Sequence, residues 1–260
     1  MNRERNINKD RVARSFSRGK STYDKNARIQ QRVSWKLLKK LTKYSELSAR
    51  NVLEIGCCTG TLTELMLSSC AVQKLYLNDL VPSFYDDVKR RLKDAEQIEI
   101  VPLFGDIEEL DLPDNLDLII SSATFQWLTD LEKLFERLAC SLNANGFLAF
   151  SIFGPGTLCE FRELTNIGLN YCSIGALLDM MDTYFHIEEE ETVKDQLFFS
   201  SPRDILRHLQ ATGVSGVDDF RWTPRKLREF EHLYADKFGT ASGIPVTYMS
   251  SYVIASKKTT

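Results

Sequence analysis

The sequence predicts an α/β fold with a doubly wound, mainly parallel sheet, and three observations support this class. Short apolar runs that are typical of buried strands alternate five times with helical patterns between residues 51 and 153. The links between them are short and polar, as expected where right-handed crossovers join parallel strands. The first run ends in a turn with two glycines, residues 56–60, directly before a helical pattern.

The five predicted strands cover residues 52–55, 74–79, 98–103, 116–120 and 147–153. Apolar residues three and four positions apart predict the helices between them, and Asn145-Gly146 is the expected stop of the last one. One further helix, residues 23–41, is predicted before the first strand, with Tyr23 and Gln30 two turns apart on one face. It can lie across the open edge of a ligand crevice.

Beyond Gly156 the alternation weakens. Helical spacing is followed by a mixed, acidic stretch at 187–191, and Ser201-Pro202 and Thr223-Pro224 each predict a helix start. A last strand is expected at 246–255. Without internal repeats or a low-complexity linker, we expect one domain, 1–260, with a helical cap at 1–45 and lid-like insertion segments at 157–190 and 221–240.

Composition excludes several classes of protein. A net charge of −3 argues against bulk binding of nucleic acid, and no apolar run approaches the roughly 20 residues that span a bilayer. The first residues lack the apolar core of a secretory signal, so a cytoplasmic location is expected. The six cysteines have neither disulfide nor zinc spacing, which predicts no metal site. The basic segment 1–20 fits either a frayed arm or a functional one.

Polar residues follow four of the predicted strands, and in an open α/β sheet such carboxyl ends form the ligand crevice. Asp79 ends the second strand, where a carboxylate can accept hydrogen bonds from both hydroxyls of a ribose; a helix N-cap or a turn residue is the alternative role. Asp106 follows the third strand and can accept from an adenine amino group. Ser122 follows the fourth.

The glycine turn argues against a dinucleotide. Its two glycines, Gly56 and Gly60, have three residues between them, which does not match the G-x-G-x-x-G spacing that fits a pyrophosphate. Glu54, inside the strand, would repel a pyrophosphate but can pair with the ammonium group of a methionine. The pattern therefore favours S-adenosylmethionine as the ligand.

These segments resemble the class I S-adenosylmethionine-dependent methyltransferases, which implies a Rossmann-like, seven-stranded sheet with helices on both faces. The chain departs from the usual turn at Cys58, which stands at the middle glycine position. We expect a small side chain to be tolerated there if its backbone keeps a negative φ. The resemblance implies a cofactor site formed by Glu54, Gly56, Cys58, Gly60, Asp79, Leu80, Asp106, Ile107 and Ser122.

Segments outside this core, 14–30, 125–128, 150–160, 209–213 and 243–248, resemble the malonyl-acyl carrier protein O-methyltransferases of biotin synthesis. The resemblance implies methyl transfer to the free carboxylate of a malonyl thioester on acyl carrier protein or coenzyme A. Such a carboxylate is ionised at pH 7 and needs placement rather than a general base. Tyr23 and Arg162 are the candidates for orienting it, with Trp127 beside them; a solvated Arg162 and a core Trp127 are the alternatives.

Acyl carrier proteins are acidic, so a basic docking face is expected. The candidates are the N-terminal arm and the cluster Arg221, Arg225, Lys226 and Arg228. Two other functions stay open: methylation of another small carboxylic acid or metabolite, and a non-catalytic adenosylmethionine-fold subunit with Cys58 as the sign of decay.

Overall fold

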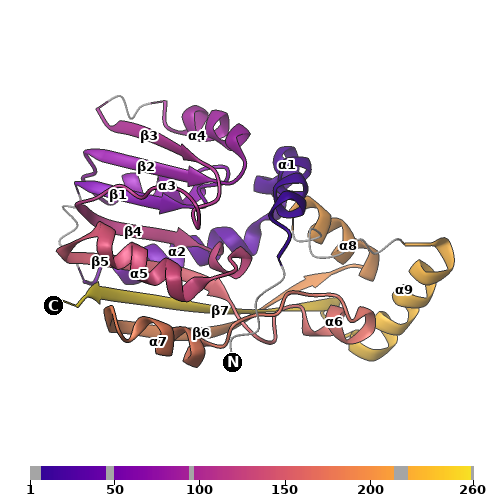
Figure 1. Cartoon of the computed structure of the whole chain (residues 1–260). Coiled ribbons are helices and arrows are strands. Elements are labelled where there is room, and N and C mark those ends of the chain that lie inside the picture. Colours follow the sequence, from indigo (N-terminus) through magenta and orange to yellow (C-terminus); the bar gives the residue numbers. More distant parts are fainter. Residues whose placement is uncertain (1–6, 45–49, 94–96, 214–221, 259–260) are drawn as a thin grey trace.

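Seven strands form one sheet in the order β3-β2-β1-β4-β5-β7-β6 (Figure 1). The structure is a computed structural model, and it describes residues 7–44, 50–93, 97–213 and 222–258. The strands are β1 (Asn51–Ile55), β2 (Lys74–Asp79), β3 (Glu99–Phe104), β4 (Leu116–Ser122), β5 (Leu142–Phe153), β6 (Phe185–Phe199) and β7 (Ile244–Lys257). Strands β1 to β5 are parallel, whereas β7 runs antiparallel to both β5 and β6. The predicted doubly wound, Rossmann-like class is confirmed.

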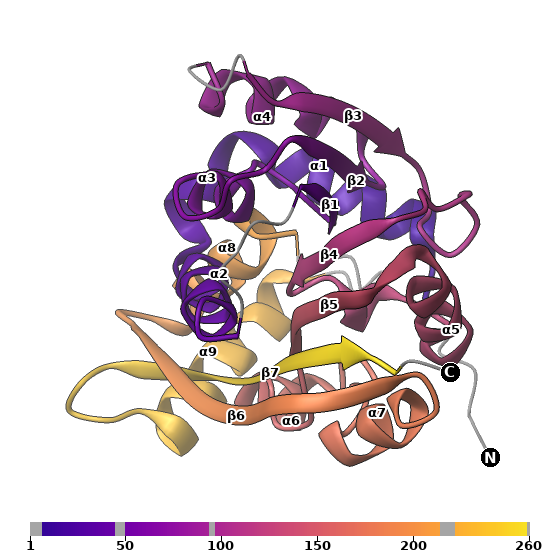
Figure 2. The ribbon, with the colours of Figure 1, turned by 90° about the vertical axis from the view of Figure 1, so that its left-hand side faces the viewer.

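Helices cover both faces of the sheet (Figure 2). They are α1 (Lys9–Asn26), α2 (Arg28–Leu41), α3 (Thr61–Leu67), α4 (Tyr85–Arg91), α5 (Leu131–Ser141), α6 (Cys159–Thr165), α7 (Ile174–Met181), α8 (Pro202–Ala211) and α9 (Pro224–Phe238), with single 3-10 turns at Pro82–Phe84 and Phe125–Trp127. Figure 2 shows α2 and α3 on one side of the sheet and α5 and α7 on the other. Within the described residues, no helix is both long and apolar enough to span a bilayer.

The central strands are apolar on both faces. Val52 and its register partner Leu118 belong to the core beneath α2 and α3, whereas Leu53 and its partner Ile119 belong to the core beneath α5 and α7. Because successive side chains of a strand point to opposite faces, a continuous apolar run contributes side chains to the cores on both faces of the sheet. The strand order runs outward from β1 on one side and from β4 on the other, so it reverses between these two strands. The ligand crevice of such a sheet lies at their carboxyl ends.

The N-terminal region differs from its prediction. The helix expected over residues 23–41 is two helices, broken at Ala27, which has φ −79° and ψ 38°. The first of them begins at Lys9, after the side chain of Asn8 accepts a hydrogen bond from the Arg11 N–H at 2.9 Å. Much of the basic arm is therefore helical, while residues 1–6 lie outside the described ranges. Tyr23 and Gln30 come from two helices, not from one face of one helix.

Two boundaries of the sheet also differ. Helix α5 ends at Ser141 rather than at Asn145-Gly146, because Leu142 is extended (ψ 145°) and pairs with Leu116 of β4. Strand β6 occupies the stretch from Phe185 onward that the sequence left as mixed and acidic. It pairs with β7 along nearly its whole length. The part of the predicted 157–190 insertion after residue 184 is thus the edge of the sheet, and the lid role of that segment stays a prediction.

Helix α8 positions α1 over the crevice. The predicted caps Ser201 and Thr223 are confirmed at the starts of α8 and α9. Gly19 lies so close to the end of α8 that an added Cβ would be 3.0 Å from the carbonyl oxygen of Ala211. Phe16 packs in the same way on Gly213, which has φ +72°. The two glycines let α1 pack closely on the end of α8.

Candidate functional site

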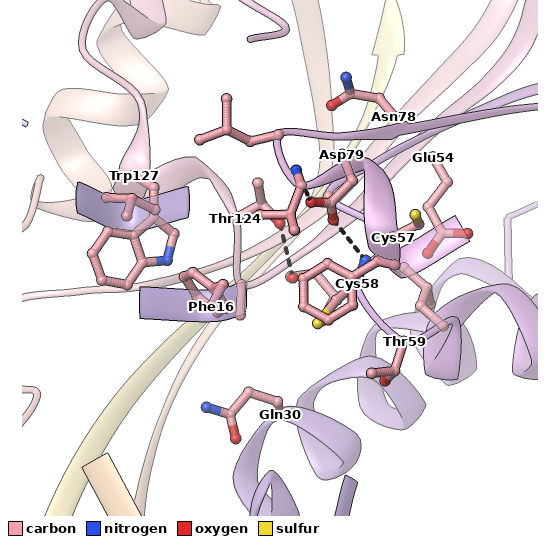
Figure 3. A pocket seen from close by; sticks show the side chains of 18 of the residues that line it. Phe16, Gln30, Glu54, Cys57, Cys58, Thr59, Asn78, Asp79, Thr124 and Trp127 are labelled. Atoms are coloured by element: carbon pink, nitrogen blue, oxygen red, sulfur yellow. Dashed lines mark hydrogen bonds between the residues drawn. The ribbon is translucent and has the colours of Figure 1, made fainter. Parts of the chain in front are cut away.

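A cavity opens at the carboxyl ends of β1, β2 and β4, under α1, and its empty space is about 960 Å³ with the open solvent at its mouth included. Figure 3 shows Glu54, Cys57 and Asp79 at one end of it, and Phe16 and Trp127 at the other. Eight of the nine predicted cofactor residues line this cavity. They are Glu54, Gly56, Cys58, Asp79, Leu80, Asp106, Ile107 and Ser122. The ninth, Gly60, has φ +84° and caps the start of α3.

Gly56 has a conformation and surroundings that exclude a side chain. Its φ is +76°, and an added Cβ would lie 2.1 Å from Oγ1 of Thr124. The N–H groups of Gly56 and Cys57 both donate to the carbonyl oxygen of Asn78 at 2.9 Å, which ties the turn to the end of β2. Bare backbone therefore forms the cavity wall at this point.

Cys58 does not have the negative φ that we expected. Its φ is +47°, in the left-handed region where a side chain costs about 1–2 kcal/mol. The N–H of Cys58 donates to Oδ2 of Asp79 at 2.8 Å, and this hydrogen bond holds the strained residue in place. The positive φ at this position is one that glycine adopts without strain. With a cysteine there, the backbone is strained.

Asp79 joins the ends of β1 and β2. Its Oδ2 accepts from Cys58 and its Oδ1 accepts from the N–H of Val81 at 2.8 Å, so it is not an N-cap. Burial raises the pKa of Asp79 to about 6, although these two N–H groups act in the opposite direction. A carboxylate has about four lone-pair sites, and the two that remain can accept from ligand hydroxyls.

Glu54 is a buried carboxyl group without a counterpart. The residue is 1% exposed, and neither of its carboxyl oxygens has a hydrogen-bond partner among the described residues. Burial raises the pKa of Glu54 to about 8; the nearby Thr63 hydroxyl, which forms no hydrogen bond of good geometry with it, acts in the opposite direction, and the Asp79 carboxylate adds to the rise. An uncompensated buried acid is costly unless a ligand supplies a cation or hydrogen-bond donors.

At the end of β3, Asp106 is already paired. Nζ of Lys9 in α1 lies 3.0 Å from its carboxylate and also contacts Glu108. A second lysine of α1, Lys20, forms an ion pair with Asp87 at 2.8 Å. The N-terminal helix is therefore held by ion pairs to the segment after β3 and to α4, which favours the functional interpretation of the basic arm.

The predicted acceptor residues do not all meet. Tyr23 and Trp127 both line the cavity, and Phe16 packs edge-on against the Trp127 ring at 5.6 Å. Burial, and then the neighbouring Cys58, raise the pKa of Tyr23 well above its ordinary value. Arg162 instead donates to the carbonyl oxygen of Leu169 at 3.0 Å and to Asn170. The described lining of the cavity does not include Arg162, which argues against it as the group that orients an acceptor.

A second, smaller cavity of about 380 Å³ adjoins the first. The two share five lining residues: Phe16, Tyr23, Gln30, Ala123 and Trp127. Sequence reasoning noted Gln30 but assigned no role to it, and it missed Lys9, Phe16 and Thr124. The heptad spacing of Lys9, Phe16 and Tyr23 was the available signal, because residues seven apart share one helix face.

Comparisons with known proteins agree with this arrangement. Residues 53–150 match a family model described as a methyltransferase domain. The chain is 38% identical over 240 residues, 90% of this chain and 91% of the relative, to a malonyl-acyl carrier protein O-methyltransferase of Calditerrivibrio nitroreducens. It is 36% identical to the protein of that name from Acinetobacter baylyi, covering 96% and 97% of the two chains.

Solved structures agree in fold. The N-methyltransferase NodS from Bradyrhizobium japonicum, in complex with S-adenosyl-L-homocysteine, aligns with a TM-score of 0.56 at 14% identity, covering 92% of this chain and 99% of NodS. The YcgJ protein of Bacillus subtilis aligns with a TM-score of 0.60 at 15% identity, covering 86% and 98%. At such low identities these structures show the architecture alone.

Proposed function

The chain belongs to the malonyl-acyl carrier protein O-methyltransferase family, and from this membership we propose that it methylates the free carboxylate of a malonyl thioester in biotin synthesis. The methyl donor is S-adenosylmethionine. The observation that carries the proposal is similarity over 96% of this chain and 97% of the relative, which includes α1 and the segments that follow β5. These segments lie outside the methyltransferase-domain match of residues 53–150.

The cavity fits this cofactor. The orphaned Glu54 carboxylate can receive the ammonium group of the methionine part, and the two remaining lone-pair sites of Asp79 can receive the ribose hydroxyls. Gly56 keeps the wall free of side chains between them. Leu80 and Ile107 supply apolar lining, and Asp106 can receive the adenine amino group.

The reaction requires little of the protein beyond the placement of the methyl donor and the acceptor carboxylate. When bound, S-adenosylmethionine supplies a methyl group whose bond to sulfur breaks as an acceptor carboxylate oxygen forms the new bond, giving a methyl ester and S-adenosylhomocysteine without proton transfer. The chain contributes orientation and exclusion of water. Helix α1 excludes water because Lys9 and Lys20 tie it down over the cavity. Phe16 and Trp127 form an apolar wall of the cavity, which would help to exclude water from the bound cofactor.

The test is methyl transfer to malonyl-acyl carrier protein, malonyl-coenzyme A, free malonate and trans-aconitate. We expect transfer to the malonyl thioesters. Transfer to a free acid alone would overturn the assigned acceptor and favour methylation of another small acid. Calorimetry with S-adenosylhomocysteine checks the remaining alternative, since a non-catalytic subunit with a damaged site would show no saturable heat.

The docking face for an acidic carrier protein stays a prediction. Of the cluster after residue 220, Arg225 and Arg228 are exposed at the start of α9, whereas Arg221 lies outside the described residues. On the N-terminal arm, Arg14 and Arg18 are exposed on one face of α1, four residues apart. Helix α1 contacts the cavity directly, so its face is the shorter route for a carrier-bound thioester.

A further inference from the structure

The smaller cavity differs from the cofactor cavity in its lining. Beyond the five shared residues it is bounded by the segment after β5, the loop after α6 and strand β7, and none of its described lining residues is charged. Three of its five hydroxyl groups are used within the protein. Thr157 accepts from the N–H of Met249 at 3.0 Å, Thr212 donates to the carbonyl oxygen of His208 at 2.8 Å, and the Tyr248 hydroxyl is bonded to His208 at 2.8 Å.

Gln30 lies at the junction of the two cavities, and its amide oxygen is unused. The residue is 9% exposed, and its Oε1 has no hydrogen-bond partner among the described residues. Figure 3 shows its side chain extending from α2 toward the side of the cavity where Phe16 and Trp127 lie. The neighbouring Gln31, in contrast, donates to the carbonyl oxygen of Asp24 at 2.8 Å.

A buried amide oxygen without a partner costs stability, so a protein that keeps one gains something else from it. The amide of glutamine has two N–H donors, and its nitrogen and oxygen can exchange places by a flip about the last side-chain bond. Tyr23, the other polar residue at the junction, has Cys58 of the cofactor turn as a neighbour; burial raises the pKa of its hydroxyl, and Cys58 adds to the rise.

We propose that the smaller cavity is the acceptor chamber and that the Gln30 amide binds the acceptor carboxylate there. This assignment rests on the proposed function and names the residue that places its substrate. A neutral donor suits the reaction, because the carboxylate loses its charge when it becomes an ester. A paired cation would stabilise the charged acceptor more than the transition state. The uncharged lining also favours the neutral ester product over a second anion.

The experiment compares Gln30→Leu, Gln30→Glu and the matched exposed control Gln210→Leu in the full chain. The first measurement is steady-state methyl transfer to malonyl-acyl carrier protein. We expect kcat/KM to fall about ten- to hundredfold in Gln30→Leu, further in Gln30→Glu because of charge repulsion, and not at all in the control. Calorimetry with S-adenosylhomocysteine should give the same affinity in Gln30→Leu as in the wild type.

Two readouts separate carboxylate binding from a structural role. Acetyl-acyl carrier protein lacks the carboxylate, so its inhibition constant for the wild type should be higher than the KM for the malonyl substrate. In Gln30→Leu the two constants should be similar. The melting temperature of Gln30→Leu should equal or exceed that of the wild type, since a buried amide oxygen without a partner is removed.

Loss of S-adenosylhomocysteine affinity in Gln30→Leu would overturn the proposal by assigning the amide to the cofactor carboxylate. Unchanged discrimination between malonyl and acetyl carriers would overturn it as well. Both outcomes differ from failure of the proposed function itself, in which the wild-type protein would not methylate malonyl-acyl carrier protein at all.

Discussion

The two ends of the site have opposite electrostatic character. At the cofactor end, the sheet places three acids, Glu54, Asp79 and Asp106, at the ends of neighbouring strands. At the other end, α1, α2 and the segments after β5 contribute aromatic rings, amides and hydroxyls. The first end suits a cationic ligand and the second suits an anion that becomes neutral. One cavity wall, formed by Phe16, Tyr23, Gln30, Ala123 and Trp127, serves both.

The largest effect is expected from Gly56→Ala. A Cβ at this φ of +76° would be strained by about 1–3 kcal/mol and would overlap Thr124. We expect S-adenosylhomocysteine binding to become undetectable by calorimetry. The control is Gly175→Ala in α7, where an added Cβ meets nothing within 4 Å and helix propensity should raise stability by up to about 1 kcal/mol. Wild-type affinity in Gly56→Ala would show that the turn does not contact the cofactor.

Glu54→Gln should weaken cofactor binding by about ten- to hundredfold, because the ammonium group loses a charged partner. The same change should alter the pH dependence of stability. The pKa of Glu54 is raised from 4.5 to about 8 on folding, so ligand-free stability falls as pH rises from about 4.5 to 8. Urea unfolding across this window should be flatter in the variant. An identical slope in both proteins would contradict the shifted pKa.

Lys9→Met tests the attachment of the cap to the cofactor end. Without its ammonium group, Asp106 and Glu108 lose the ion pairs that hold the start of α1. We expect the KM values for both substrates to rise several-fold with little change in melting temperature, since partly exposed ion pairs contribute about 0–1 kcal/mol. Lys89→Met, on α4 away from these acids, is the control. Steady-state kinetics decides, and unchanged KM values would mean that α1 stays closed without this contact.

The smallest effect is expected from Cys58→Gly. Glycine has no penalty at the φ of +47°, so the strain at this residue should be relieved. The greater freedom of glycine in the unfolded chain offsets part of the gain, which leaves a net stabilisation of about 1 kcal/mol or less. Thermal unfolding measures it, with methyl transfer at least equal to the wild type. A clear destabilisation would show that the thiol has a contact that outweighs its backbone strain.

The cofactor end was predictable from sequence because its signals are local. Strands end in acids or glycine turns, and the residues that line the crevice follow directly after apolar runs. The same argument could not give the φ of Cys58, since the sign of a dihedral angle depends on the hydrogen bond to Asp79, 21 residues away. The spacing of residues in the sequence shows which residue types occur together, but it does not give the backbone dihedral angles that they adopt.

The cap and the far edge of the sheet were less predictable. Strand β6 is an edge strand whose side chains alternate between exposed and half-buried, so its apolar content is too low to stand out. Helix α1 owes its order to the close packing of Gly19 and Phe16 on the end of α8, about 190 residues later in the chain. Arg162 was assigned from residue type alone, and the loop carbonyl of Leu169 decides where its guanidinium lies.

The shared wall between the two cavities also bears on the order of binding. Phe16 and Tyr23 belong to α1, so an acceptor held in the smaller cavity contacts the helix that covers the cofactor. With the acceptor in the proposed chamber, α1 would lie over both cavities and would block the way into the larger one. The arrangement thus favours an ordered kinetic scheme, in which the methyl donor loads first and its demethylated product leaves last.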